Sequence, residues 1–309
     1  MDEPSIKRIE MINRNESIDS LKGLLIVFVI LGHSLLGSLD DNAIRYVIYS
    51  FHMPVFLFLS GYLINYEKIS DLSIKELGKK YWKRMLFPWT VALVVYSVFL
   101  NATDFTLHAL VRRLAIPYYH LWYVPTLFVF ILMTWLLSKF KSKTISVILL
   151  IGTGLMLDKL YLQTETFRLN YLIFFAVGVM VRNVKLRVDN LRLGGGILCL
   201  FLITIIILAE NNITMDFYRR NLMMPFMMVV CLLSVLPVII IDGFKCSALG
   251  FIGEHSLEVY LWHVLPIIIL KHFIPDAQAS YLYYLLIIAL IVMLLVFSWI
   301  KTKKVTVNS

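Results

Sequence analysis

The amino-acid sequence predicts an all-α protein, a polytopic membrane helical bundle of about ten transmembrane helices with both termini in the cytoplasm. Of its 309 residues, 60% are hydrophobic and only 16% are charged. The mean hydropathy is +0.80, which lies outside the usual range for a soluble domain. Apolar runs follow one another with short connections, so we expect a single membrane domain over residues 1–309. A polar cytoplasmic segment (1–16) precedes the first span, and a cytoplasmic tail (302–309) follows the last.

Ten apolar runs have about the 17 to 25 residues that a helix needs to cross a bilayer. They cover residues 19–38, 44–64, 85–102, 119–138, 144–160, 167–182, 193–210, 220–241, 256–273 and 281–300. Gly152 and Gly154 interrupt the fifth run, and the sixth is short. The connection 66–83 is polar and is expected to form a short amphipathic helix that ends in a basic run.

Positive charge predicts the orientation of these spans. Twenty Lys and Arg residues fall on the side of the termini. Eight fall on the other side: Arg45, Arg112, Arg113, Lys159, Arg168, Arg219, Arg220 and Lys271. The positive-inside rule then puts both termini in the cytoplasm, as in a multi-pass protein of the cytoplasmic (inner) membrane. The net charge of +9 is expected to face anionic membrane lipids, and we expect no nucleic-acid partner.

The first span carries Lys22 near its start and His33 eleven positions later. Eleven steps of about 100° return a helix to within roughly 20° of its starting direction, about 16 Å further along the axis. The two side chains therefore share one face. Titratable groups inside a membrane helix are costly and usually face a protein interior or a watery cavity. We expect this face to form a wall of the active site.

The second span adds His52, which helix rise puts at a depth similar to that of His33. Pro54 cannot donate a backbone hydrogen bond, so it is expected to free the carbonyl of Ser50 and kink the helix. His52 and Ser60 share a polar side of this span. A neutral imidazole suits general-base chemistry. The alternatives are a hydrogen bond between helices and nucleophilic catalysis by Ser60 or Ser34, for which no nucleophile-elbow motif is present.

Basic residues at the start of the third span are candidates for binding a polyphosphate. Lys83 and Arg84 end the basic run that precedes Pro88, and Arg84 is able to contact a phosphate in a bidentate manner. The alternative is an anchor that touches lipid headgroups. Neither the three cysteines nor any other pattern predicts a metal site, and no permanently bound cofactor is expected.

Two later segments are rich in aromatic residues and histidine. HLWYVP (His120 to Pro125) opens the fourth span, and SLEVYLWHVLP (Ser256 to Pro266) forms much of the ninth. Together with Ser60 of the second span, Trp122, Tyr260 and His263 are candidates for lining a substrate pocket. Interface anchoring of Trp122 and structural packing of His263 are the alternatives.

Together these segments resemble the acyltransferase-3 family of membrane acyltransferases, especially its fucose 4-O-acetylase-like branch. The resemblance covers nearly the whole chain. It rests on the pair Lys22 and His33, on FHMPVFLFLSGYL (residues 51–63), on KRMLFP (residues 83–88), and on the two aromatic segments above. It implies transfer of an acyl group, commonly acetyl from acetyl-CoA, to a hydroxyl of a sugar or another envelope molecule. It further implies that His33 is essential and that Lys22 and the Arg84 region serve the CoA side.

The resulting hypothesis is an O-acetyltransferase that modifies polysaccharide or another envelope acceptor. Acetyl-CoA, as co-substrate, docks from the cytoplasm with its phosphates on Arg84, Lys83 and Lys22. A glycan or lipid-linked sugar then loses its hydroxyl proton to His33, with His52 assisting, and a ping-pong variant stays open. The competing hypothesis is a transporter or flippase for a glycan or lipid-linked sugar, against which no internal repeat is visible. Neither the acceptor nor the oligomeric state is predicted.

Overall fold

The computed structural model describes residues 15–100, 106, 111–114, 116–118, 120–140, 142–164, 166–183, 191–274 and 281–307. These residues are mainly helical, and none of them is in a strand. The all-α prediction is therefore confirmed for the described part of the chain. Residues 1–14 of the expected N-terminal segment and residues 308 and 309 of the expected tail lie outside it. Residues 302–307 of that tail continue the last helix, α18 (Tyr281–Val307).

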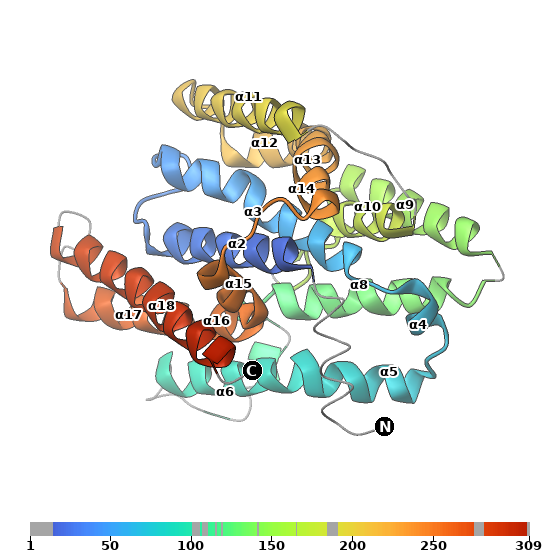
Figure 1. The fold of residues 1–309 in the computed structure, drawn as a ribbon, viewed down its shortest axis with the longest axis horizontal. Helices are drawn as coiled ribbons and strands as arrows, with labels where there is room; N and C mark the ends of the chain where they lie inside the picture. The colour runs from blue at the N-terminus through green and yellow to red at the C-terminus, as the bar shows by residue number, and fades with distance from the viewer. Residues whose placement is uncertain are drawn as a thin grey trace.

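Helices α2 (Glu16–Ser34) and α3 (Ala43–Tyr62) lie at the centre of the bundle (Figure 1). Helix α15 (Ser247–Glu254) crosses α2 at very short range. A Cβ atom on Gly23 would lie 2.0 Å from the carbonyl oxygen of Leu249, and one on Gly253 would lie 1.8 Å from the carbonyl oxygen of Asp19. Small residues allow two backbones to approach this closely, so the glycines fix where α15 sits on α2.

Helix α10 (Leu172–Asn183) packs in the same way on α3, where a Cβ on Gly61 would lie 2.0 Å from the carbonyl oxygen of Phe175. Helix α3 continues through Pro54. The carbonyl of Ser50, which Pro54 leaves without its helical donor, accepts a hydrogen bond of 3.1 Å from the buried hydroxyl of Tyr218. The sequence predicted the freed carbonyl, and the structure shows the group that satisfies it.

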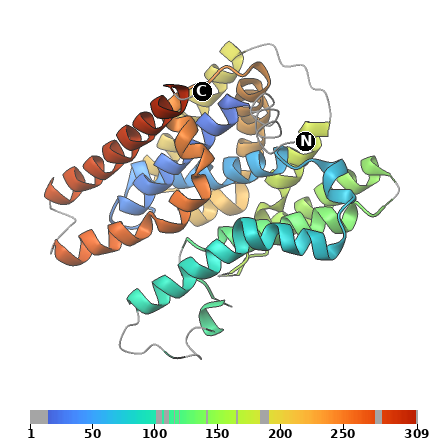
Figure 2. The ribbon, with the colours of Figure 1, turned by 60° about the horizontal axis from the view of Figure 1, so that its bottom comes forward.

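The connection after α3 differs from the expected single short helix. It forms α4 (Tyr66–Ser70) and α5 (Ile74–Tyr81), and α5 runs through a π-helical turn (Trp82–Leu86) directly into α6 (Phe87–Leu100). Figure 2 shows α5 and α6 as one long rod in teal. Pro88 explains the turn, because it has no N–H to give to the carbonyl of Arg84. The extra residue of a π-turn lets the helix continue past this gap.

The remaining helices surround this centre (Figure 1). They are α8 (Tyr123–Leu137), α9 (Lys143–Lys159), a 3₁₀ turn (Leu169–Tyr171), α11 (Leu191–Glu210), α12 (Met215–Asn221), α13 (Met223–Val230), a second π-turn (Cys231–Val235), α14 (Leu236–Ile241), α16 (Ser256–Trp262) and α17 (Val264–Phe273). The ninth expected span is thus two helices that meet at His263. Pro266 accounts for the break, since it cannot donate to the carbonyl of Trp262.

Each of the ten expected spans overlaps one or more helices of the described residues. Five helical stretches of the described residues are long and apolar enough to cross a membrane: Glu16–Ser34, Ala43–Tyr62, Ile74–Leu100, Leu191–Glu210 and Met223–Ile241. Three further apolar helices are shorter: Tyr123–Leu137, Leu169–Arg182 and Tyr281–Leu294. A membrane protein with several spans agrees with these lengths. The count of ten and the orientation of the termini stay predictions.

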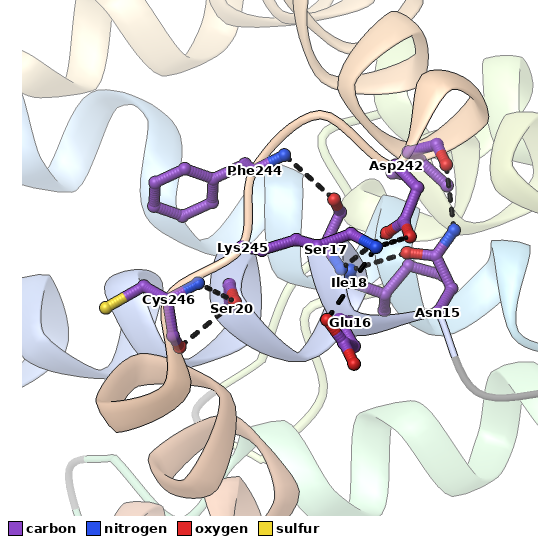
Figure 3. Close-up of polar contacts among 10 residues, drawn as sticks. Asn15, Glu16, Ser17, Ile18, Ser20, Asp242, Phe244, Lys245 and Cys246 are labelled. Atoms are coloured by element: carbon purple, nitrogen blue, oxygen red, sulfur yellow. Dashed lines mark hydrogen bonds and ion pairs between the residues drawn. The ribbon is translucent and has the colours of Figure 1, made fainter. Parts of the chain in front are cut away.

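The segment between α14 and α15 is tied to the first turns of α2 (Figure 3). Asp242 adopts a left-handed conformation that ends α14, and its carboxylate accepts a hydrogen bond of 3.1 Å from the backbone N–H of Ser17. The backbone N–H groups of Phe244 and Cys246 donate to the hydroxyls of Ser17 and Ser20, at 2.9 Å and 3.0 Å. A carboxylate at a helix N-terminus is favourable. These bonds hold α15, and with it α16, against α2.

Candidate active site

Two neighbouring cavities lie within the bundle, and both are lined by α2, α3 and α16. The first, which we call the basic cavity, has a volume of about 430 Å³. Its charged lining residues are Lys22, Lys68, Lys80, Arg84, Glu254 and Glu258. The second, which we call the histidine cavity, has a volume of about 1010 Å³ and is lined by His33, His52 and His120. The single pocket expected from the sequence is therefore a pair of cavities.

The basic cavity contains two of the three residues predicted to bind the donor. Lys22 lines it and forms an ion pair of 3.0 Å with Asp19, and Arg84 lines it from the π-turn. Lys83 and Arg84 are both exposed, but Lys83 does not line either cavity. Neighbouring residues on a helix point about 100° apart, so with Arg84 facing the cavity, Lys83 faces away. Its predicted role is not supported by the geometry.

Ser60 also lines the basic cavity, and its hydroxyl is fully engaged. It donates to the carbonyl oxygen of Phe56 at 2.8 Å and lies 2.9 Å from the hydroxyl of Tyr123. With its proton given to the carbonyl, Ser60 accepts the hydrogen bond from Tyr123. No imidazole lies among these contacts, so the arrangement lacks the adjacent base that activates a nucleophilic serine.

Three imidazoles from different parts of the chain pack together beside the histidine cavity. His33 and His120 line the cavity, whereas His263, predicted as a pocket residue, lies behind them and lines neither cavity. The ring of His33 lies 5.2 Å from that of His263 and 6.0 Å from that of His120, and the latter two rings are 5.1 Å apart, all between centroids. His33 is half-buried, while His120 and His263 are buried. The predicted residues His33 and His263 are thus brought together, and His120 joins them.

Backbone contacts fix the protonation of two of these rings. Nδ1 of His263 lies 2.7 Å from the carbonyl oxygen of Tyr260, and Nε2 of His120 lies 3.4 Å from that of Leu261. A carbonyl only accepts, so each of these nitrogens carries the proton. The other ring nitrogens, Nε2 of His263 and Nδ1 of His120, are buried and have no hydrogen-bond partner within the described part of the chain. Both nitrogens are therefore acceptors without a hydrogen bond from any described residue and are shielded from solvent.

His52 reaches His33 through Tyr49. Nδ1 of His52 donates to the carbonyl oxygen of Ile48 at 2.6 Å, and the ring lies 5.1 Å from that of Tyr49. The hydroxyl of Tyr49 is 3.4 Å from Nδ1 of His33. The two predicted histidines therefore share one cavity, as their matched depths indicated, with a tyrosine between them.

The histidine cavity is also strongly cationic. Arg45, Arg113, Arg168, Arg219 and Lys271 line it, and no Asp or Glu is among the described residues that do so. Trp122, predicted as a pocket residue, lies in this wall with the guanidinium carbon of Arg168 5.7 Å from its ring centroid.

Met53 and Tyr260 line both cavities. Tyr260 contacts the rings of Tyr123 on the basic side, at 5.3 Å, and of His120 on the histidine side, at 5.7 Å. Its hydroxyl is buried and has no hydrogen-bond partner in the described structure. A ligand that extends from one cavity into the other must pass these two side chains.

No role was predicted for His120 or Tyr49. His120 was visible as the first residue of HLWYVP, at the outer end of an expected span. Tyr49 precedes His52 by three residues and so lies on the same helix face. The described residues contain no group of three His, Cys, Asp or Glu side chains arranged to hold a metal ion.

Comparison with known proteins gives one family and one relative. A family model described as an acyltransferase domain matches residues 15–303. The chain is 31% identical over 148 residues to the nodulation protein NolL of Sinorhizobium fredii (strain NBRC 101917 / NGR234). That match covers 42% of this chain and 38% of the length of NolL. No solved structure matches.

Proposed function

The chain belongs to the acyltransferase-3 family, and from this premise we propose that it transfers an acetyl group from acetyl-CoA to a hydroxyl of a cell-envelope acceptor. The acceptor class is a sugar, either in a polysaccharide or linked to a lipid. The observation that carries the proposal is the junction at Met53 and Tyr260, which lies between a cavity with basic residues and a cavity with histidines. A donor and an acceptor that enter from the two sides would meet there. The match to NolL, a nodulation protein, concerns only part of that protein.

The donor occupies the basic cavity in this proposal. Arg84, Lys80 and Lys22 would bind the phosphates of CoA, because guanidinium and ammonium groups form strong charge-assisted hydrogen bonds with phosphate oxygens. The thioester would then extend past Ser60 to Tyr260. We assign this cavity to the cytoplasmic side of an inner membrane, in line with the positive-inside rule.

The acceptor hydroxyl lies beside His33. If Nδ1–H of His33 donates to the Tyr49 oxygen, Nε2 keeps its lone pair and acts as the general base. The acceptor oxygen attacks the thioester carbonyl carbon while Nε2 takes its proton. The C–S bond then breaks, the CoA sulfur takes the proton back from the imidazolium, and the acetyl ester and free CoA result. The unpartnered hydroxyl of Tyr260 is a suitable donor to the oxyanion that forms on the carbonyl oxygen.

A binding measurement on the purified full chain tests this proposal. Acetyl-CoA should raise the Tm in a concentration-dependent manner, because a ligand that binds the folded state stabilises it. A glycan transporter or flippase does not use acetyl-CoA, so its Tm should not change. Absence of any shift at saturating acetyl-CoA, together with no loss of acetyl-CoA when envelope glycans are added, would exclude the proposed reaction.

A further inference from the structure

The strongest feature that the proposed reaction leaves unused is the set of cations in the histidine cavity. Arg45, Arg113, Arg168, Arg219 and Lys271 come from five separate segments of the chain and line one cavity. No described ion pair connects any of them to a carboxylate. Like charges in a partly buried space repel one another. The arrangement is therefore unfavourable unless a bound anion offsets the positive charge.

Two of these side chains show how the wall is held. Arg45 donates its Nε–H to the carbonyl oxygen of Gly32 at 3.2 Å and a second N–H to that of Gly37. Its guanidinium also lies 5.4 Å from the ring centroid of Tyr49. Lys271 lies 3.4 Å from the carbonyl oxygen of His33. The positive charges are therefore held next to the base.

Arg219 is the most informative of the five. Its Nε is buried and has no hydrogen-bond partner in the described structure. The next residue, Arg220, is exposed and pairs with Asp216 at 2.7 Å, and it does not line the cavity. A buried donor without a partner is costly. Thus one of two adjacent arginines is paired with a carboxylate at the surface. Among the described residues, the other lines the cavity without a carboxylate partner, and its Nε–H is buried and makes no hydrogen bond.

We propose that the histidine cavity binds an oxyanion carried by the acceptor, either a phosphate or a carboxylate. Planar guanidinium groups match both groups by bidentate hydrogen bonding. The two sources are the phosphate of a phosphorylated or lipid-linked sugar and the carboxylate of an acidic sugar. This inference rests on the proposed function, since it takes the ligand in this cavity to be the acceptor and not the donor. The cations of the cavity would then form a specificity site. They would select an acceptor by its negative charge before its hydroxyl reaches His33.

The test measures binding to the purified full chain by Tm and by tryptophan fluorescence, which Trp122 in the cavity wall should report. The probes are inorganic pyrophosphate, methyl glucuronide as a carboxylate sugar, methyl glucoside as a neutral sugar, and acetyl-CoA. Wild type and Arg220→Gln should bind pyrophosphate or the glucuronide with saturation and should not respond to the glucoside. Arg219→Gln should bind the same anion about tenfold more weakly or worse. The anion that binds identifies the source.

A second variant, Lys271→Gln, alters an exposed side chain. It should lower the affinity for the same anion without affecting folding. No saturable binding of either anion up to about 10 mM, or equal affinities of Arg219→Gln and Arg220→Gln, would overturn the inference. So would loss of acetyl-CoA binding in Arg219→Gln, because the cavity would then hold the donor's phosphates. Failure of the proposed function has a different signature, which is no response of the wild type to acetyl-CoA whatever the anions do.

Discussion

Tyr260 on α16 and Met53 on α3 both line the basic cavity and the histidine cavity. Helix α16 is positioned by α15, which the glycine contacts and the Asp242 segment hold against α2. The junction between the cavities therefore depends on the packing of α15 on α2. A change in this packing should therefore also affect the place where donor and acceptor are proposed to meet.

Removing the hydroxyl of Tyr260 should impair transfer. Tyr260→Phe keeps the ring and its packing but loses the donor at the junction, so we expect kcat to fall about tenfold or more with little change in the KM for acetyl-CoA. Tyr46→Phe is the matched control, since the Tyr46 hydroxyl is also buried without a partner in the described structure but lines neither cavity. Equal activities of the two variants would argue against a role for Tyr260 in the reaction.

Arg84 and Lys83 should behave differently although they are adjacent. Arg84→Gln removes a cation from the wall of the basic cavity and should raise the KM for acetyl-CoA about tenfold, the range of a lost charge-assisted hydrogen bond. Lys83→Gln changes an exposed cation outside the cavity and should leave the KM unchanged. Initial rates measured against acetyl-CoA concentration give the KM of each variant. A larger increase in KM for Lys83→Gln than for Arg84→Gln would contradict the assignment of Arg84, and not Lys83, to the wall of the basic cavity.

Gly23→Ala should destabilise the fold by about 1–3 kcal/mol. The new Cβ would lie 2.0 Å from the carbonyl oxygen of Leu249, so α15 must move away from α2. Gly195→Ala on α11 is the control, because a Cβ there meets nothing within 4 Å and alanine is the better helix former. The Tm of the purified variants is the measurement. A Gly23→Ala protein as stable as Gly195→Ala would show that the two helices do not approach so closely.

Asp242→Asn tests the tie between α14 and α2, and its effect should depend on pH. Hydrogen bonds from Lys245 and Ser17 hold the pKa of the Asp242 carboxyl below its ordinary value of 3.8. A carboxyl with a lowered folded pKa stabilises the fold above its unfolded pKa and loses this effect as the pH falls through the folded value. Asparagine tolerates the left-handed backbone, so the substitution removes mainly the charge. We expect a lower Tm than wild type at neutral pH and a difference that shrinks below pH 3.8; a difference independent of pH would exclude the charge as its cause.

Much of the fold was predictable because its signals are local. Apolar runs marked where the helices lie, and Pro54 marked a carbonyl that would need another donor. The donor, Tyr218, lies 168 residues away from Ser50, and no local pattern indicates such a pairing. The ninth run appeared continuous because hydropathy does not register the hydrogen bond that Pro266 removes.

The site was predictable in part, for the same reason. Helix rise predicted that His33 and His52 lie at a similar depth, and both line the histidine cavity. The convergence of Arg45, Arg168 and Arg219 was not predicted, because basic residues between spans were counted for orientation only. Lys83 and Arg84 must point in different directions because they are neighbours on a helix. Which of the two lines the cavity depends on how this segment packs, and the sequence spacing does not show that.

The most direct test of the account asks whether an acetyl group reaches the envelope through His33. Mass spectrometry should compare envelope glycans and lipid-linked sugars from cells that produce the wild type, His33→Ala, or no protein. We expect the acetyl mass increment with wild type alone. Both proteins should be present in the membrane in equal amounts, and the variant should keep the acetyl-CoA-dependent Tm shift. An increment of wild-type size in the His33→Ala cells would contradict the account.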